Sequence, residues 1–171
     1  MALSKKLQEE LNKQINFELY SAYLYAAMAA DMKAKNLVGI AAWLRQQAHE
    51  ELLHAMRFSE FVLDRDGRVR MAALKAPPAE WDSPLAAFSA AFEHEQSVTR
   101  RLGELLEIAV GEKDAATQNI VRFFIDEQVE EEASLNEVVH QLKLVGSDGA
   151  GVYLIDRQLA ARPAPAPLGK P

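Results

Sequence analysis

One stretch of the chain decides its fold, residues 37–64, which read LVGIAAWLRQQAHEELLHAMRFSEFVLD. Followed in alternating steps of three and four residues, the stretch is apolar from Leu37 to Val62 except at Glu51, which lies near its midpoint. That spacing is typical of the buried seam of a helix in a bundle. The stretch therefore predicts a long helix whose buried face carries a single carboxylate.

The same pattern recurs in three other long segments, and glycine, proline and capping residues mark their ends. We expect Asn36, Ser83 and Asp114 to cap helices, and Gly111 and Gly146 to end them. The expected helices cover about residues 4–35, 37–64, 83–111 and 114–146, with a short fifth over 152–161.

These segments predict an all-α fold, a four-helix bundle with a short fifth helix. The first and second helices, and the third and fourth, have short connections and should form antiparallel hairpins. The longer second-to-third connection can run the length of the bundle, which predicts a crossover topology. The chain has 171 residues, and we expect one domain over 1–161 and a disordered Pro/Ala-rich tail over 162–171.

Each long segment carries one glutamate near the middle of an otherwise apolar seam. Helices that run up and down a bundle share only their midpoints, so the four carboxylates should meet at one depth. No Lys or Arg falls on a seam, and a buried cluster of like charges is unstable without a counter-charge. The four glutamates, which predict a cation site, are Glu18, Glu51, Glu95 and Glu131.

His54 favours a metal ion, because it follows Glu51 by three residues on the same side of the helix. The pair Glu-x-x-His recurs as a ligand set in di-iron bundles, and its mixture of oxygen and nitrogen suits iron or manganese. The simpler alternative is a structural bundle with a protonated or hydrated polar layer. The cost of burying several carboxylates disfavours that alternative.

Two further residues on the seams allow two interpretations each. Gln128, one turn before Glu131, could orient ligands or bound water, or it could be an ordinary core amide. Tyr25, two turns after Glu18, could donate a hydrogen bond or an electron near the metals. A core tyrosine whose hydroxyl reaches a carboxylate is the commoner arrangement.

A second acidic group adjoins the first. Glu50 precedes Glu51, and Glu127 and Glu130 lie beside Glu131. Such a run is usually a solvated helix face. Because this one borders the predicted metal layer, we expect a weaker accessory cation site there.

Composition excludes several classes of site and partner. The chain has no cysteine, which excludes disulfide frameworks, thiolate zinc sites and iron–sulfur clusters. A net charge of -6 disfavours nucleic-acid binding. Neither a signal peptide nor an apolar run long enough to span a membrane is evident, so we expect a cytoplasmic protein without a membrane partner.

Together these motifs make the sequence resemble a bacterial non-haem ferritin. The resemblance covers about residues 3–161 and implies a ferritin-like bundle that assembles into a shell of 24 subunits. It implies a ferroxidase that oxidises Fe(II) with dioxygen or hydrogen peroxide and stores the product as mineral. The implied first iron site is Glu18, Glu51 and His54, and the second is Glu51, Glu95 and Glu131 with Gln128 close by. The implied third iron site is Glu50, Glu127, Glu130 and Glu131.

The sequence differs at several positions from what related ferritin families would have there. A bacterioferritin would have a second Glu-x-x-His in place of residues 127–131 and a haem-binding methionine where this chain has Leu52. No haem is therefore expected. Animal ferritins line a three-fold pore with acidic residues, and the corresponding positions here are expected at Gln118 and Val121.

Two other functions compete with iron storage. A di-iron oxidase or peroxidase acting on other substrates would usually have two Glu-x-x-His pairs, and it would be a small oligomer rather than a hollow shell. A non-catalytic helical bundle acting as an interaction module would bind no iron.

Overall fold

The computed structural model describes residues 2–161, so the predicted tail at 162–171 lies outside the described residues. Within that range the chain forms helices and no strand. None of these helices is both long enough and apolar enough to cross a membrane. The helices are α1 (Lys5–Ala34), α2 (Val38–Asp64), α3 (Pro84–Gly111), α4 (Ala115–Val145) and α5 (Gly149–Ala160).

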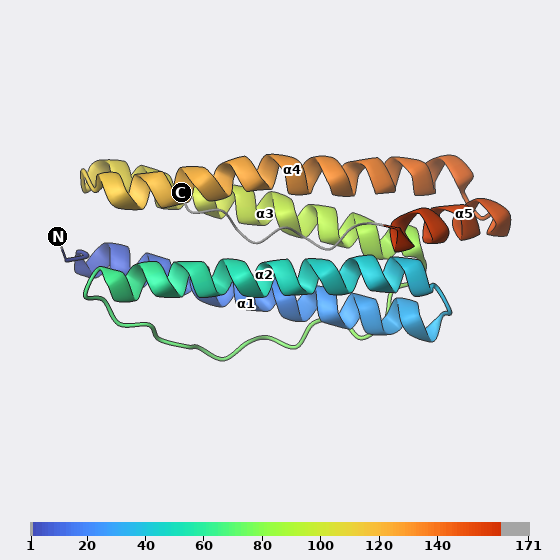
Figure 1. Cartoon of the computed structure of the whole chain (residues 1–171), viewed down its shortest axis with the longest axis horizontal. Coiled ribbons are helices and arrows are strands. Elements are labelled where there is room, and N and C mark those ends of the chain that lie inside the picture. Colours follow the sequence, from blue (N-terminus) through green and yellow to red (C-terminus); the bar gives the residue numbers. More distant parts are fainter. Residues whose placement is uncertain (1, 162–171) are drawn as a thin grey trace.

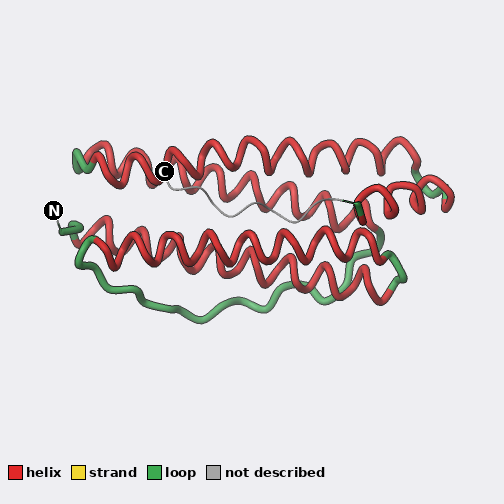
Figure 2. The backbone as a smooth tube through the Cα atoms, viewed as in Figure 1, coloured by secondary structure: helices red, strands yellow, loops and turns green. Residues whose placement is uncertain are grey.

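The four long helices lie side by side along one axis, and α5 sits at one end of the bundle (Figure 1). The hairpins α1–α2 and α3–α4 both form, as predicted from their short connections. The connection over residues 65–83 runs back along the bundle, so α3 points in the same direction as α2 (Figure 2). The predicted crossover topology is confirmed.

Two of the three predicted caps are confirmed. Ser83 and Asp114 accept hydrogen bonds from backbone N–H groups in the first turns of α3 and α4. Asn36 does not cap α2. Its φ of 61° is left-handed, and it ends α1 in the conformation that asparagine tolerates best after glycine.

The cap of α2 comes instead from α5. One carboxylate oxygen of Asp156 accepts the N–H groups of Gly39 and Ile40, at 2.8 and 2.9 Å. Gly39 permits this approach, because a Cβ at that position would lie 1.8 Å from the backbone oxygen of Asp156. The short fifth helix is thus fastened to the bundle, and it begins at Gly149 rather than at the expected residue 152.

The apolar core is divided into two clusters along the bundle. One contains Tyr25, Leu44 and Phe88 and lies towards α5. The other contains Ile15 and Phe58 and lies towards the opposite end. In all four long helices the residues between the two clusters include a predicted seam glutamate, so the core is interrupted by one polar layer.

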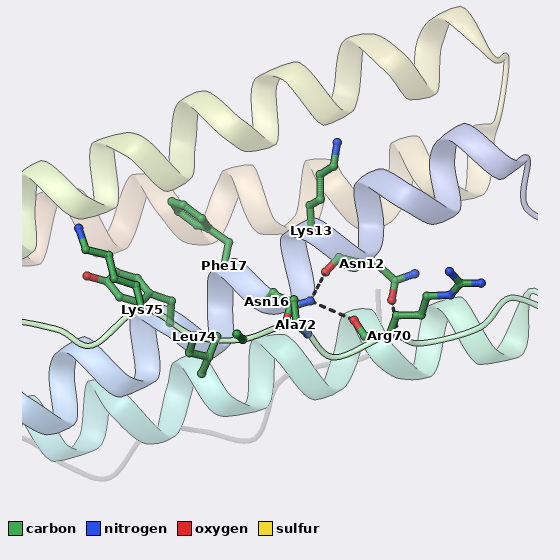
Figure 3. A pocket seen from close by; sticks show the side chains of 10 residues that line it. Asn12, Lys13, Asn16, Phe17, Arg70, Ala72, Leu74 and Lys75 are labelled. Carbon is green, nitrogen blue, oxygen red and sulfur yellow. Dashed lines mark hydrogen bonds between the residues drawn. The ribbon is translucent and has the colours of Figure 1, made fainter.

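Side-chain amides of α1 hold the long connection. Asn12 accepts the N–H of Arg70, and Asn16 donates to the Arg70 carbonyl at 3.0 Å (Figure 3). A surface pocket of about 560 Å³ lies between α1 and this segment, lined by Phe17 and Leu74 among others (Figure 3). No candidate metal ligand lines this pocket.

Candidate metal centre

Three of the candidate ligands form a compact group inside the bundle. Glu18 from α1 and Glu51 and His54 from α2 each bring one ligand atom within 4.8 Å of the other two. Their exposed fractions are 1%, 1% and 3%. Because His54 follows Glu51 by three residues, both side chains leave α2 on the side that faces α1.

Glu95 from α3 joins the same layer and is held at both oxygens. The Tyr25 hydroxyl donates to Oε1 at 2.7 Å, and the Gln128 amide donates to Oε2 at 2.9 Å. Glu131 from α4 accepts a hydrogen bond at Oε2 from the Gln47 amide at 2.7 Å. The structure therefore brings together the mid-seam glutamates of all four helices.

The electrostatics of the layer show how unfavourable it is without a cation. Burial, reinforced by the charge of Glu51, raises the pKa of Glu18 to about 8. Burial and the charges of Glu95 and Glu131 raise the pKa of Glu51 well above its usual range. Burial is also the main reason that the pKa values of Glu95 and Glu131 rise to about 7. These carboxyl groups must either keep protons at neutral pH or share a positive charge.

The donor set fits a divalent cation. Oε2 of Glu18 and Oε1 of Glu51 are buried and accept no hydrogen bond from an N–H or hydroxyl donor of the described residues, and without a metal the two carboxyl groups can only share a proton with each other. Nδ1 of His54 lies 3.6 Å from the other oxygen of Glu51. Buried acceptors without donors are costly, and a metal ion removes that cost. Carboxylate oxygens with one imidazole suit iron or manganese.

The two halves of the layer differ. One oxygen of Glu18 and one of Glu51 are open to an ion, whereas both oxygens of Glu95 already accept hydrogen bonds from Tyr25 and Gln128. An ion near Glu95 must compete with these donors for its ligand. Tyr25 adopts the commoner of its two predicted arrangements, a core hydroxyl that reaches a carboxylate. The amide of Gln128 contacts both the carboxylate of Glu95 and its backbone carbonyl, at 2.9 and 3.3 Å, so the role of Gln128 as a ligand-orienting residue stays a prediction.

Two residues of the layer were missed from the sequence. Gln14 donates to Oε1 of Glu18 at 2.7 Å, and Gln47 donates to Glu131. Both are fully buried. Each lies four residues before a seam glutamate, and this spacing was the available signal. Each stands one position away from the strict seam, so the seam pattern alone does not include it.

His94 and a second pair with the Glu-x-x-His spacing, Glu137 and His140, lie outside this layer. His94 packs on the ring of Phe17 and shares a 2.7 Å hydrogen bond with the hydroxyl of Ser21. Its burial lowers its pKa to about 4, so it is a neutral core histidine. Glu137 and His140 have the ligand spacing but are exposed on α4.

The second acidic group is only partly assembled near the layer. The charge of Glu50 contributes to the raised pKa values of Glu51 and Glu131. Glu127 is half-buried and Glu130 is exposed on α4. A third metal site at these residues remains a prediction.

The expectation for the pore position Val121 is wrong. Its side chain has no exposure and packs in the apolar cluster with Phe124, so it cannot line a channel. Gln118 is half-buried and donates to the carbonyl of Ala109 at 3.3 Å.

Comparison with known proteins agrees with this architecture. Residues 8–145 match the ferritin-like domain. The chain is 37% identical to the bacterial non-haem ferritin of Bacteroides fragilis over 160 residues, which covers 94% of this chain and 99% of that protein. It is 39% identical to that of Staphylococcus aureus, with coverage of 94% and 96%.

Solved structures show the same fold. The open pore ferritin of the archaeon Archaeoglobus fulgidus is 48% identical and superimposes with a TM-score of 0.93, covering 95% of this chain and 100% of that one. A humanized archaeal ferritin is 45% identical with a TM-score of 0.94, covering 96% and 100%. The predicted resemblance is confirmed, and this chain belongs to the ferritin family.

Proposed function

We propose that this protein stores iron and that each subunit oxidises Fe(II) at the acidic layer inside its own bundle. Membership of the ferritin family and the names of the bacterial relatives support iron storage. The single observation that carries the ferroxidase proposal is the pair of buried oxygens on Glu18 and Glu51, beside His54, that no N–H or hydroxyl donor of the described residues reaches.

The proposed roles divide the layer into two adjoining iron sites. Glu18 and His54 would bind the first Fe(II), Glu95 and Glu131 would bind the second, and Glu51 would bridge both. Gln128 and Tyr25 would keep Glu95 oriented through their hydrogen bonds. The accessory third site would be formed by Glu50, Glu127, Glu130 and Glu131.

The proposed chemistry takes one electron from each bound Fe(II). Two Fe(II) and one dioxygen with two protons give two Fe(III) and one hydrogen peroxide. If hydrogen peroxide is the oxidant, two Fe(II) and two protons give two Fe(III) and two waters. A site with oxygen ligands and one imidazole favours Fe(III), and the few nitrogen ligands allow it to leave for storage.

We further propose that the oxidised iron is deposited inside a cytoplasmic shell of 24 copies of this chain, without haem. Support for a hollow assembly comes from the archaeal relative described as an open pore ferritin, which covers 95% of this chain. Support for a site within one subunit comes from the four helices of a single chain that all contribute to the layer.

Aerobic addition of Fe(II) tests the proposal. Wild-type protein should show a rapid rise in Fe(III) absorbance, and Glu51→Ala with His54→Ala should lose that rapid phase. The matched control is Glu137→Ala with His140→Ala, which removes the same residue types at the same spacing from the surface. Unchanged kinetics in the first double variant would reject the site, and light scattering of the iron-loaded sample would report the size of the assembly.

A further inference from the structure

We infer that Gln14 and Gln47 are positioning residues of the metal centre, each fixing one carboxylate through an amide N–H so that an ion meets an oriented ligand. The inference rests on the proposed function and assigns the two glutamines to different iron sites. Gln14 acts on Glu18, which belongs to the first site alone. Gln47 acts on Glu131, which belongs to the second site and to the proposed third site but not to the first.

Gln14 holds one oxygen of Glu18 and leaves the other open. Its amide nitrogen lies 2.7 Å from Oε1, one helical turn along α1, while no N–H or hydroxyl donor of the described residues reaches Oε2. A carboxylate tied at one oxygen has a restricted rotation, so the open oxygen keeps a defined direction. The open oxygen belongs to Glu18, which forms the compact group of candidate ligands with Glu51 and His54.

Stability alone does not explain a glutamine at position 14. The side chain has no exposure, and its own Oε1 accepts no hydrogen bond from the described residues. A half-satisfied buried amide is less favourable than an apolar side chain of the same size. Its donor is directed at a candidate ligand, which gives the amide a function that an apolar residue cannot supply.

Gln47 works between helices. It lies on α2, four residues before Glu51, and is fully buried. Its amide reaches Oε2 of Glu131 on α4 at 2.7 Å, across 84 residues of sequence. This hydrogen bond links the helix that carries the bridging glutamate to the helix that carries a ligand of the second site.

The test measures metal binding by the intact assembled protein at pH 7, with Zn²⁺ alone as a redox-inert probe. Gln14→Met and Gln47→Met keep an unbranched buried side chain but cannot donate a hydrogen bond. Calorimetric titration gives the affinities, and anomalous diffraction at one Zn²⁺ per subunit identifies the site that fills. Gln118→Met is the control, because Gln118 donates to a backbone carbonyl instead of a ligand.

We expect Gln14→Met to weaken binding at the Glu18 site by about 10-fold or more, and Gln47→Met to weaken the Glu131 site by a similar factor. Gln118→Met should leave both affinities unchanged. Wild-type affinities in both variants would overturn the inference, as would equal weakening of both sites accompanied by a lower melting temperature of the metal-free protein.

Failure of folding is also informative. If Gln14→Met does not assemble, Gln14→Leu replaces it, and failure of both would assign Gln14 to folding and overturn its role as a positioning residue. If wild-type protein binds no Zn²⁺ in the layer and does not oxidise Fe(II), the proposed function itself fails. Normal wild-type binding with unaffected glutamine variants would reject only the inference.

Discussion

Filling the metal-free centre should release protons, and the number follows from the raised pKa values of its carboxyl groups. A pKa of about 8 for Glu18 and about 7 for Glu95 and Glu131 leaves about two protons on these three groups at pH 7. Burial and the charges of Glu95 and Glu131 also raise the pKa of Glu51, so Glu51 can only add to this number. Saturation with a divalent ion should therefore release at least about two protons per subunit at pH 7.

The release should fall as pH rises, because groups that have already lost their protons have none to give. At pH 8.5 Glu18 has lost most of its proton and Glu95 and Glu131 nearly all of theirs, so these three groups together should release less than about half a proton per subunit. The affinity for the ion should rise over the same interval, since fewer protons compete for the carboxylate oxygens.

Calorimetric titration with Zn²⁺ in buffers of different ionisation enthalpy measures this number directly. The slope of the apparent enthalpy against the buffer enthalpy gives the protons released. The variant with Glu51→Ala and His54→Ala serves as the background for adventitious binding. Release of less than about one proton at pH 7, or an equal release at pH 7 and 8.5, would refute the reasoning from burial and charge.

Three further predictions concern stability and are measured on the metal-free protein unless stated. Folding raises the pKa values of Glu18, Glu95 and Glu131, so their bound protons stabilise the folded state. This stabilisation is complete below about pH 4.5 and is lost as pH rises through 7 to 8. The melting temperature should fall as pH rises through 7 to 8, and it should recover when Zn²⁺ is added at pH 8. A melting temperature that rises with pH in the absence of metal would contradict this prediction. Asp156→Ala leaves the buried N–H groups of Gly39 and Ile40 without an acceptor and should cost about 2 kcal/mol in urea unfolding, whereas exposed Asp82→Ala should cost little. Phe58→Ala, which removes a ring stacked 4.2 Å from Phe124, should cost about 3–5 kcal/mol, and a loss below about 1 kcal/mol would mean that the core collapses around the gap.

The sequence predicted the fold because most of its signals are local. Ser83 and Asp114 act within three residues of themselves, and the seams repeat every three or four residues, so both can be recognised without knowledge of the partner helix. The crossover also followed from the length of the connection. Asn36 failed as a cap because the true acceptor, Asp156, is 117 residues from Gly39 and cannot be recognised locally.

The candidate site shows the same division between local and long-range information. Four glutamates could be placed at one depth because helix midpoints coincide, and His54 follows from the spacing to Glu51. Gln14 and Gln47 needed the structure, since only the positions of the neighbouring helices decide which carboxylate an off-seam amide reaches. Val121 was wrongly expected at a pore because alignment with a family position does not reveal burial in the core.

Anomalous diffraction at the iron edge, from crystals soaked anaerobically in Fe(II), tests the central claim most directly. We predict two iron peaks per subunit within the bundle, one bounded by Glu18, Glu51 and His54 and the other by Glu51, Glu95 and Glu131. A structure with no iron between these side chains, while iron is bound elsewhere on the protein, would contradict the account.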